Sequence, residues 1–167
     1  GQSVVPGETV QVNWDAYGEP TATFKLEYSL DNGASWALIN SSISAAVRRY
    51  EWVVPNNPVS QALVRIERNG TGLSHTSQPF NILGVPSLSL SSAQCEGYTA
   101  LSWTTVPGAT DYELMMKKGD EMVTIATTSS TSFIVSELSR DSVYWFSVRA
   151  RNNGKPRGRA VAVSRRP

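Results

Sequence analysis

The side chains that could carry out catalysis are few and scattered in this sequence of 167 residues. His75 is the only histidine, and no Gly-x-Ser-x-Gly turn accompanies it, so the parts of a serine hydrolase are not assembled in the pattern. The single cysteine, Cys95, can form neither an internal disulfide nor a cysteine-based metal site. The acidic pair Asp111 and Glu113 falls at outward-facing positions, where solvated charge is usual. We therefore predict that the chain is not an enzyme and has no cofactor and no resident metal.

The segment from Ser29 to Trp36 has the pattern Ser-x-Asp-x-Gly-x-Ser-Trp. We expect Asp31 to accept hydrogen bonds from turn amides, Gly33 to take a positive φ, and Trp36 to pack beneath the hairpin. The pattern resembles the Asp-box of sialidase propellers, but a propeller needs several copies and this chain has one. We predict a structural role. The alternative is a calcium site at Asp31 or Asp120, completed by backbone carbonyls.

Composition and charge limit the class of partner. The chain is 40% hydrophobic and 17% charged, as in an ordinary globular protein, and its net charge of +1 argues against binding nucleic acid. Residues 1–83 carry five Lys or Arg against seven Asp or Glu, and residues 84–167 carry ten against seven. No apolar run approaches the roughly 20 residues that cross a bilayer. We interpret the chain as a monomeric, extracellular or cell-surface fragment without a membrane span.

Apolar and polar residues alternate along most of the chain, as in half-buried strands. Val10, Val12 and Trp14 show the pattern in the first half. Turn signals separate the alternating segments, and helical spacing is lacking. We therefore predict an all-β chain of two tandem immunoglobulin-like β-sandwiches, each with about seven antiparallel strands, at residues 1–83 and 84–167. The linker near residues 83–86 is short, so we expect a restricted angle between the domains.

The second half contains the sequence features of a known family. Trp103 lies on the expected second strand, a Val-Pro-Gly turn leads into the third, and Leu138 precedes Tyr144 by six residues, as in a tyrosine corner. This half resembles a fibronectin type III domain. The first half, with Trp14 and Tyr28, resembles a divergent relative from large secreted bacterial proteins.

The resemblance implies a function without catalysis. It implies a tandem spacer, adhesion or binding module of a larger secreted or cell-surface protein, which contacts a protein, a glycan or neighbouring domains of its parent. The alternative is an accessory, non-catalytic part of a secreted hydrolase such as a peptidase or a glycan-degrading enzyme. The fold by itself selects neither, since it serves many functions.

Strand alternation in the second half predicts one candidate interaction surface. If Tyr144 and Phe146 face the core, their neighbour Trp145 faces outward. The same reasoning places these residues on the outer face: Met115, Lys117, Arg149 and Arg151. An exposed tryptophan beside methionine and cations is typical of interaction patches. The alternatives are that Arg149 covers Trp145 through a cation–π contact, or that a neighbouring domain covers both.

A second candidate surface is basic. Between the last two expected strands lie Lys155, Arg157 and Arg159. The final expected strand covers residues 160–163. We expect them to form a loop at one end of the sandwich, where binding residues often lie. Such a loop could bind a polyanion.

Overall fold

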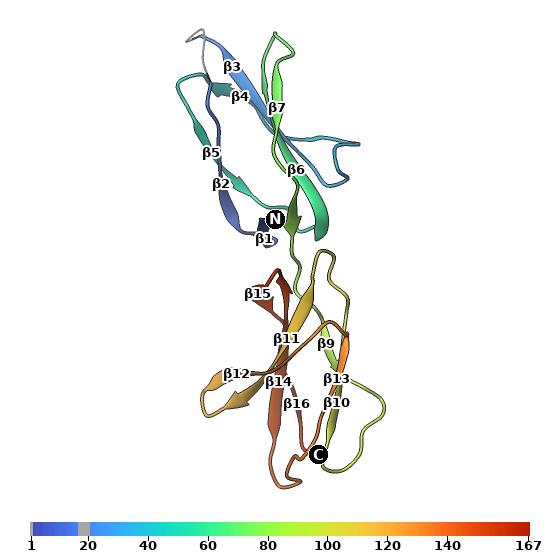
Figure 1. The fold of residues 1–167 in the computed structure, drawn as a ribbon. Coiled ribbons are helices and arrows are strands. Elements are labelled where there is room, and N and C mark those ends of the chain that lie inside the picture. Colours follow the sequence, from blue (N-terminus) through green and yellow to red (C-terminus); the bar gives the residue numbers. More distant parts are fainter. Residues whose placement is uncertain (1, 17–20) are drawn as a thin grey trace. The chain divides into compact units, whose positions relative to one another are not determined.

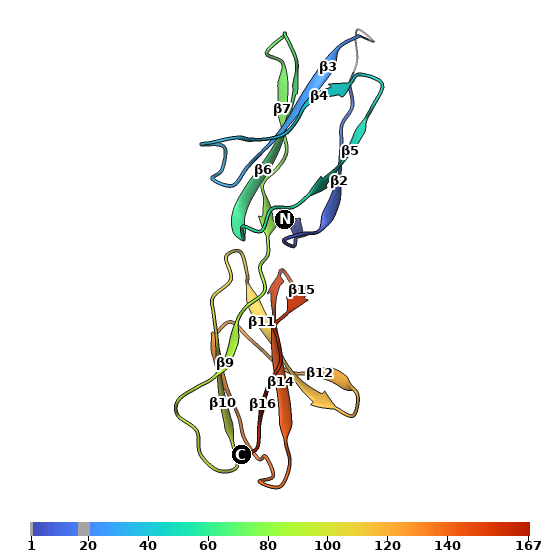
Figure 2. The ribbon, with the colours of Figure 1, turned by 180° about the vertical axis from the view of Figure 1, so that it is seen from behind.

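The computed structural model describes residues 2–16 and 21–167, and every regular element in these ranges is a β-strand (Figure 1). The chain divides into two compact units, residues 1–82 and 83–167. Figure 2 shows the same strands from behind. In the described ranges, no helix is long and apolar enough to cross a membrane. The all-β fold class predicted from the alternation is confirmed.

The first unit contains two sheets that face each other across one core. The larger sheet consists, in order across it, of β1 (Ser3–Val4), β8 (Phe80–Ile82), β6 (Val59–Arg68), β3 (Thr23–Ser29) and β4 (Ala37–Ser44), and β7 (Ser74–Thr76) also pairs with β6. The smaller sheet consists of β2 (Thr9–Asn13) and β5 (Arg49–Val53).

One pair of strands in this unit is parallel, although the sequence predicts antiparallel pairing throughout. Ser3 and Val4 of β1 pair in parallel register with Asn81 and Ile82 of β8. A parallel pair needs a long crossover connection, usually a helix. Here the intervening strands of the sandwich themselves supply that connection, because β1 and β8 are the first and last strands of the unit.

The core of the first unit joins the two sheets. Leu26 of β3 and Ile82 of β8 are fully buried in it. Trp52 of β5 is 5% exposed, and its ring centroid lies 5.4 Å from that of Tyr28 and 6.3 Å from that of Phe80. Trp52 therefore anchors the two-stranded sheet to the larger one.

The turn between β3 and β4 is built from the Asp-box pattern. Asp31 accepts the backbone N–H of Ser35 at 2.8 Å and its hydroxyl at 2.5 Å, and the Ser29 hydroxyl donates to Asp31 at 2.7 Å. Gly33 has a φ of 92°, which favours glycine, and donates its N–H to Ser29 Oγ at 2.8 Å. A Cβ on Gly33 would lie 3.6 Å from the Trp36 ring. Both carboxylate oxygens of Asp31 are thus bonded within the turn.

These hydrogen bonds predict an acid-sensitive turn. The bonds from Ser35, with a further one from Ser29, lower the pKa of Asp31 from 3.8 to about 2. A carboxyl whose folded pKa is depressed stabilises the fold above its unfolded pKa and loses this effect as the pH falls through the folded value. We expect Asp31→Asn to be less stable than the parent near neutral pH, and the difference to shrink between about pH 4 and pH 2. Thermal denaturation of both proteins across this range measures it, and a difference that stays constant with pH would contradict the assignment.

The second unit also has two sheets. The smaller one consists, in order, of β13 (Ser132–Val135), β10 (Thr99–Trp103) and β9 (Leu88–Leu90). The larger one consists of β12 (Glu121–Thr128), β11 (Asp111–Lys118), β14 (Tyr144–Asn152) and β15 (Lys155–Arg159), and β16 (Val163–Arg165) also pairs with β14. Leu83 is fully buried in the core of this unit.

Aromatic side chains organise the second core. Trp103 is 6% exposed, and its ring centroid lies 5.8 Å from that of Tyr112. The Tyr144 hydroxyl accepts the N–H of Ser139 at 3.0 Å, which is the backbone contact of a tyrosine corner. The N–H of Leu138 donates to the carbonyl of Gly97 at 3.0 Å in the same region. These contacts hold the turn that leads into β14.

Candidate functional site

The candidate surface is the outer face of β11 and β14, two neighbouring strands of the larger sheet in the second unit. Phe146 and Val148 on β14 are fully buried on the inner face. Trp145, between the core-facing Tyr144 and Phe146, is 45% exposed. The last paired residues of β11 and β14 are Met116 and Phe146. The residues one position beyond this pair are Lys117 on β11 and Trp145 on β14. Lys117 is exposed.

Met115 is buried, at 7% exposure, so the prediction that it faces solvent is wrong. The bulge in the pairing of β11 with β12 places its extra residue, Ile125, on β12, and β11 pairs with β14 without interruption, so Leu114 and Met115 still lie on opposite faces of the sheet. Both residues are buried, so the outer face of the sheet is covered at Met115. Opposite Met115, the Ser147 hydroxyl is fully buried and donates to the carbonyl of Ala160 at 2.8 Å. The exposed surface is therefore smaller than the sequence predicts.

Arg149 and Arg151 are paired with acidic side chains. Glu113 lies directly opposite Arg149, and Asp111 lies opposite Arg151. Arg149 Nε is 2.5 Å from one carboxylate oxygen of Glu113, and Arg151 Nη1 is 3.2 Å from the other. Arg151 Nε also donates to Asp111, and this hydrogen bond raises the pKa of Arg151. The four side chains form a charge-balanced ladder across the two strands.

This ladder changes the interpretation of the surface. Arg149 bonds Glu113, whereas the cation–π contact found among the described residues joins Arg65 to Trp36, with the guanidinium carbon 4.0 Å from the ring centroid. Sequence reasoning treated Glu113 as a solvated charge. The alternation of residues in the sequence predicts that Glu113 and Arg149 both face outward. It does not predict the strand register that places them opposite each other.

Loss of Glu113 is expected to destabilise the second unit. Glu113→Ala leaves two half-buried guanidinium groups without their shared partner, which we expect to cost about 1–2 kcal/mol after allowing for solvent screening. Chemical denaturation measures the change, and salt should reduce it because the pairs are partly exposed. Glu121→Ala, at an exposed position on neighbouring β12, is the matched control. Equal effects of the two substitutions would show that the ladder contributes nothing.

Lys155, Arg157 and Arg159 lie on a strand, so the prediction that they form a loop is wrong. Asn153 and Gly154 have φ angles of 48° and 74°, as in a two-residue type I′ turn, and this turn joins β14 directly to β15. Lys155 and Arg159 are exposed, whereas Arg157 is half-buried. The last strand begins at residue 163 rather than at residue 160.

His75 lies on β7 and is exposed. It borders a groove together with Asp15 and Ser77. The Ser77 hydroxyl accepts the N–H of Val64 at 3.0 Å, and within the described ranges no hydrogen bond links Ser77, His75 and Asp15. The described residues contain no cluster of three or more His, Cys, Asp or Glu side chains suited to a metal ion. His75 therefore shares a groove with Asp15 and Ser77 and has no hydrogen bond to either of them among the described contacts.

Several solved structures of fibronectin type III proteins are similar to this chain. The crystal structure of FN3tt is 26% identical, with 48% of this chain and 84% of that chain covered and a TM-score of 0.40. A two-domain fibronectin type III segment from chicken tenascin is 13% identical, with 97% and 94% covered and a TM-score of 0.49. A cytokine receptor complex is 18% identical, with 96% and 91% covered and a TM-score of 0.54.

At the sequence level, no protein-family model and no curated protein matches the chain. The likeness to the chain from the cytokine receptor complex extends over nearly the whole of this chain and shows a shared fold. Each unit independently has two facing sheets with its own core, and the second unit has the tyrosine corner. The chain is therefore a tandem of two β-sandwiches with the fibronectin type III-like fold.

Proposed function

We propose that this chain is a non-catalytic pair of modules in a larger secreted or cell-surface protein, and that it contacts a protein or a glycan through Trp145. The observation that carries the proposal is the 45% exposure of Trp145 on the outer face of the larger sheet of the second unit. Tryptophan is enriched at the centres of interfaces because it offers a large apolar area with one N–H donor. A protein with the same fold is part of a receptor complex, which supports a role in binding.

The charge pattern around Trp145 favours an apolar contact over a purely ionic one. Arg149 and Arg151 already have acidic partners, so a ligand would have to break these pairs to use them. Lys117 is exposed on the neighbouring strand β11, one position beyond the last residue that pairs with β14. A ligand of this surface would therefore stack on the indole and place a polar or anionic group near one lysine.

The test uses the 167-residue chain labelled with a fluorophore at Cys95, which is exposed. The labelled chain is applied to arrays of glycans and of extracellular proteins. Trp145→Ala is expected to weaken binding by roughly tenfold or more, as for other central aromatic contacts. Ile134→Ala is the control, since Ile134 is 61% exposed on β13 of the other sheet. Binding that is equal in both variants, or no binding to either array, would refute the proposal.

A further inference from the structure

The pair Asn-Gly occurs three times in the chain, and its asparagines are Asn32, Asn69 and Asn153. An asparagine before glycine is open to deamidation, because glycine has no side chain to shield its backbone nitrogen. The glycine nitrogen loses its proton and bonds the asparagine Cγ, the Cγ–Nδ2 bond breaks, and the side-chain amide takes up that proton and leaves as ammonia. Water then opens the cyclic imide. Cleavage of the N–Cγ bond gives aspartate, and cleavage of the peptide C–N bond gives isoaspartate.

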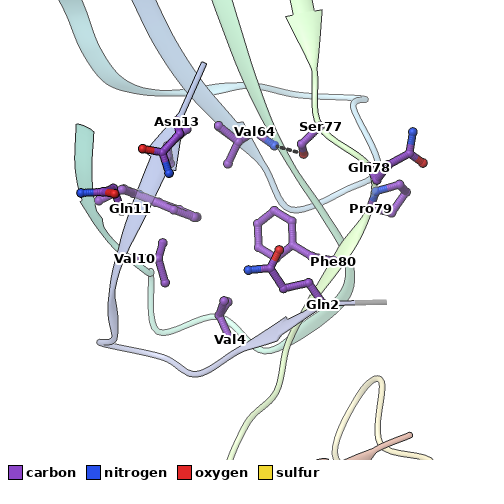
Figure 3. A pocket seen from close by; sticks show the side chains of 12 residues that line it. Gln2, Val4, Val10, Gln11, Asn13, Val64, Ser77, Gln78, Pro79 and Phe80 are labelled. Atoms are coloured by element: carbon purple, nitrogen blue, oxygen red, sulfur yellow. Dashed lines mark hydrogen bonds between the residues drawn. The ribbon is translucent and has the colours of Figure 1, made fainter. Parts of the chain in front are cut away.

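The folded backbone separates the reacting atoms in two of these pairs. Asn32 and Asn153 have φ angles of 57° and 48°, in the left-handed region. In this conformation the nitrogen of the next residue points away from the asparagine side chain, so the reaction requires local opening of the turn. All three pairs lie outside the groove that Val10 and Phe80 border in the first unit (Figure 3). The contacts within each turn therefore determine how easily it opens.

The turn at Asn32 is held by several contacts. The N–H of Gly33 donates to Ser29 Oγ at 2.8 Å, so the attacking nitrogen is already bonded. Asp31 accepts bonds from Ser29 and from the backbone two positions beyond Gly33. A Cβ on Gly33 would lie 3.5 Å from Leu63 Cδ1, so the turn also packs against β6. Opening it breaks all of these contacts.

Asn69 is held by its side chain as well as its backbone. Its Nδ2 donates to Thr23 Oγ1 at 2.8 Å and to the carbonyl of Ser41 at 3.0 Å. Its backbone N–H donates to the carbonyl of Thr23 at 2.9 Å. These three bonds reach β3 and β4, and they fix the carbon that the glycine nitrogen would attack.

Asn153 has the fewest such contacts of the three. Its N–H donates to Thr110 Oγ1 at 3.1 Å, and its Nδ2 donates to the side chain of Asn152 at 3.3 Å. The N–H of Gly154 donates no hydrogen bond within the described ranges, and a Cβ on Gly154 would meet nothing within 4 Å. Both residues are exposed, and β15, which follows them, pairs with β14 alone among the described strands. Opening this turn therefore breaks few contacts.

We propose that Asn153 is a site of spontaneous deamidation in the folded chain, whereas Asn32 and Asn69 are protected by their turns. Aspartate at this position adds a negative charge two residues before Lys155. Isoaspartate adds a methylene to the main chain of a two-residue turn, which loosens the pairing of β14 with β15. The modification thus changes the charge and the order of the basic strand β15, and it is independent of the function proposed for Trp145.

The test incubates the folded 167-residue chain in mildly alkaline buffer and follows each asparagine by peptide mapping with mass spectrometry. We expect Asn153 to react at least about tenfold faster than Asn32 and Asn69, because its turn opens more easily. The reference is the chain unfolded in denaturant, in which we expect three similar rates, since each asparagine precedes glycine. Similar rates in the folded chain overturn the proposal. So does an Asn153 that stays intact while the unfolded chain is fully modified.

Two variants test whether the turn contacts set the rates. Thr110→Val removes the oxygen that accepts the N–H of Asn153, and we expect it to speed the reaction of Asn153 roughly three- to tenfold. Thr23→Val removes one acceptor of the Asn69 side chain, and it should speed Asn69 alone. If neither variant changes its own asparagine, the contacts do not control the reaction and the proposal fails.

The effect on the hairpin is measured on the product. The isoaspartate form is separated by chromatography, and NMR compares the hydrogen exchange of its β15 amides with that of the unmodified chain. We expect faster exchange in β15 and unchanged exchange in the first unit. Equal exchange in β15 would show that the turn tolerates the added methylene, and it would overturn the inferred loosening.

Discussion

Phe146→Ala is expected to destabilise the second unit by about 3–5 kcal/mol, the usual cost of removing a buried aromatic side chain. Phe146 is fully buried between the two sheets, and its ring centroid lies 6.4 Å from that of Tyr144 in a stacked arrangement. The substitution leaves a cavity in a core whose neighbours, Leu114 and Val148, are also fully buried. A loss of this size is a large part of the stability of a small domain.

Denaturation monitored by near-ultraviolet circular dichroism and by NMR measures the effect of Phe146→Ala. NMR also separates the units: we expect the signals of the second unit to change and those of the first to persist, since its core contains no residue of the second. Val143→Ala is the matched control, because Val143 is 58% exposed and precedes the same strand, and we expect a change of less than about 0.5 kcal/mol. A Phe146→Ala midpoint equal to that of the control would refute the assignment of this core.

Trp52→Ala is expected to destabilise the first unit by a similar amount, about 3–5 kcal/mol. The ring of Trp52 contacts Tyr28 of β3 and Phe80 of β8, so it joins the two-stranded sheet to the larger one. Val10, Val12 and Tyr50 of the same sheet also pack against this core, but they are only partly buried, whereas Trp52 is 5% exposed. We therefore expect β2 and β5 to lose protection against hydrogen exchange before the strands of the larger sheet.

The adjacent residue provides the control for Trp52→Ala. Val53 is 61% exposed on the outer face of β5, so Val53→Ala changes the same strand without altering the core. Hydrogen exchange of the β2 and β5 amides, with chemical denaturation, compares the two variants. If Val53→Ala destabilised the unit as much as Trp52→Ala, strand propensity rather than core packing would be the main contribution.

Local patterns in the sequence predicted the local features of the fold. The Asp-box residues form one turn, in which Asp31 and Ser35 bond each other over four positions. Asn153 and Gly154 form a tight hairpin turn, as their residue types indicate. Such features depend on residues that are close in the chain, and their geometry follows from residue type. Tertiary context has little influence on them.

Features that depend on pairing between distant segments were not predictable in the same way. The burial of Met115 depends on what covers the outer face of the sheet, where Ser147 on the neighbouring strand is also fully buried. The neutralisation of Arg149 depends on Glu113, 36 residues away in the chain. The pairing of β1 with β8, in the sheet opposite to β2, depends on segments almost 80 residues apart in the chain. The sequence offers several registers for each of these strands.

The sequence by itself determined that the chain is all-β, because side chains on a strand alternate between its faces and this alternation is a local property. It also indicated that Trp145 faces outward while Phe146 faces the core. Only the tertiary structure decided which charges meet, which outward side chains are covered, and which strands pair. These depend on the energies of contacts between distant segments, which compete with one another and are resolved only when the whole sandwich packs.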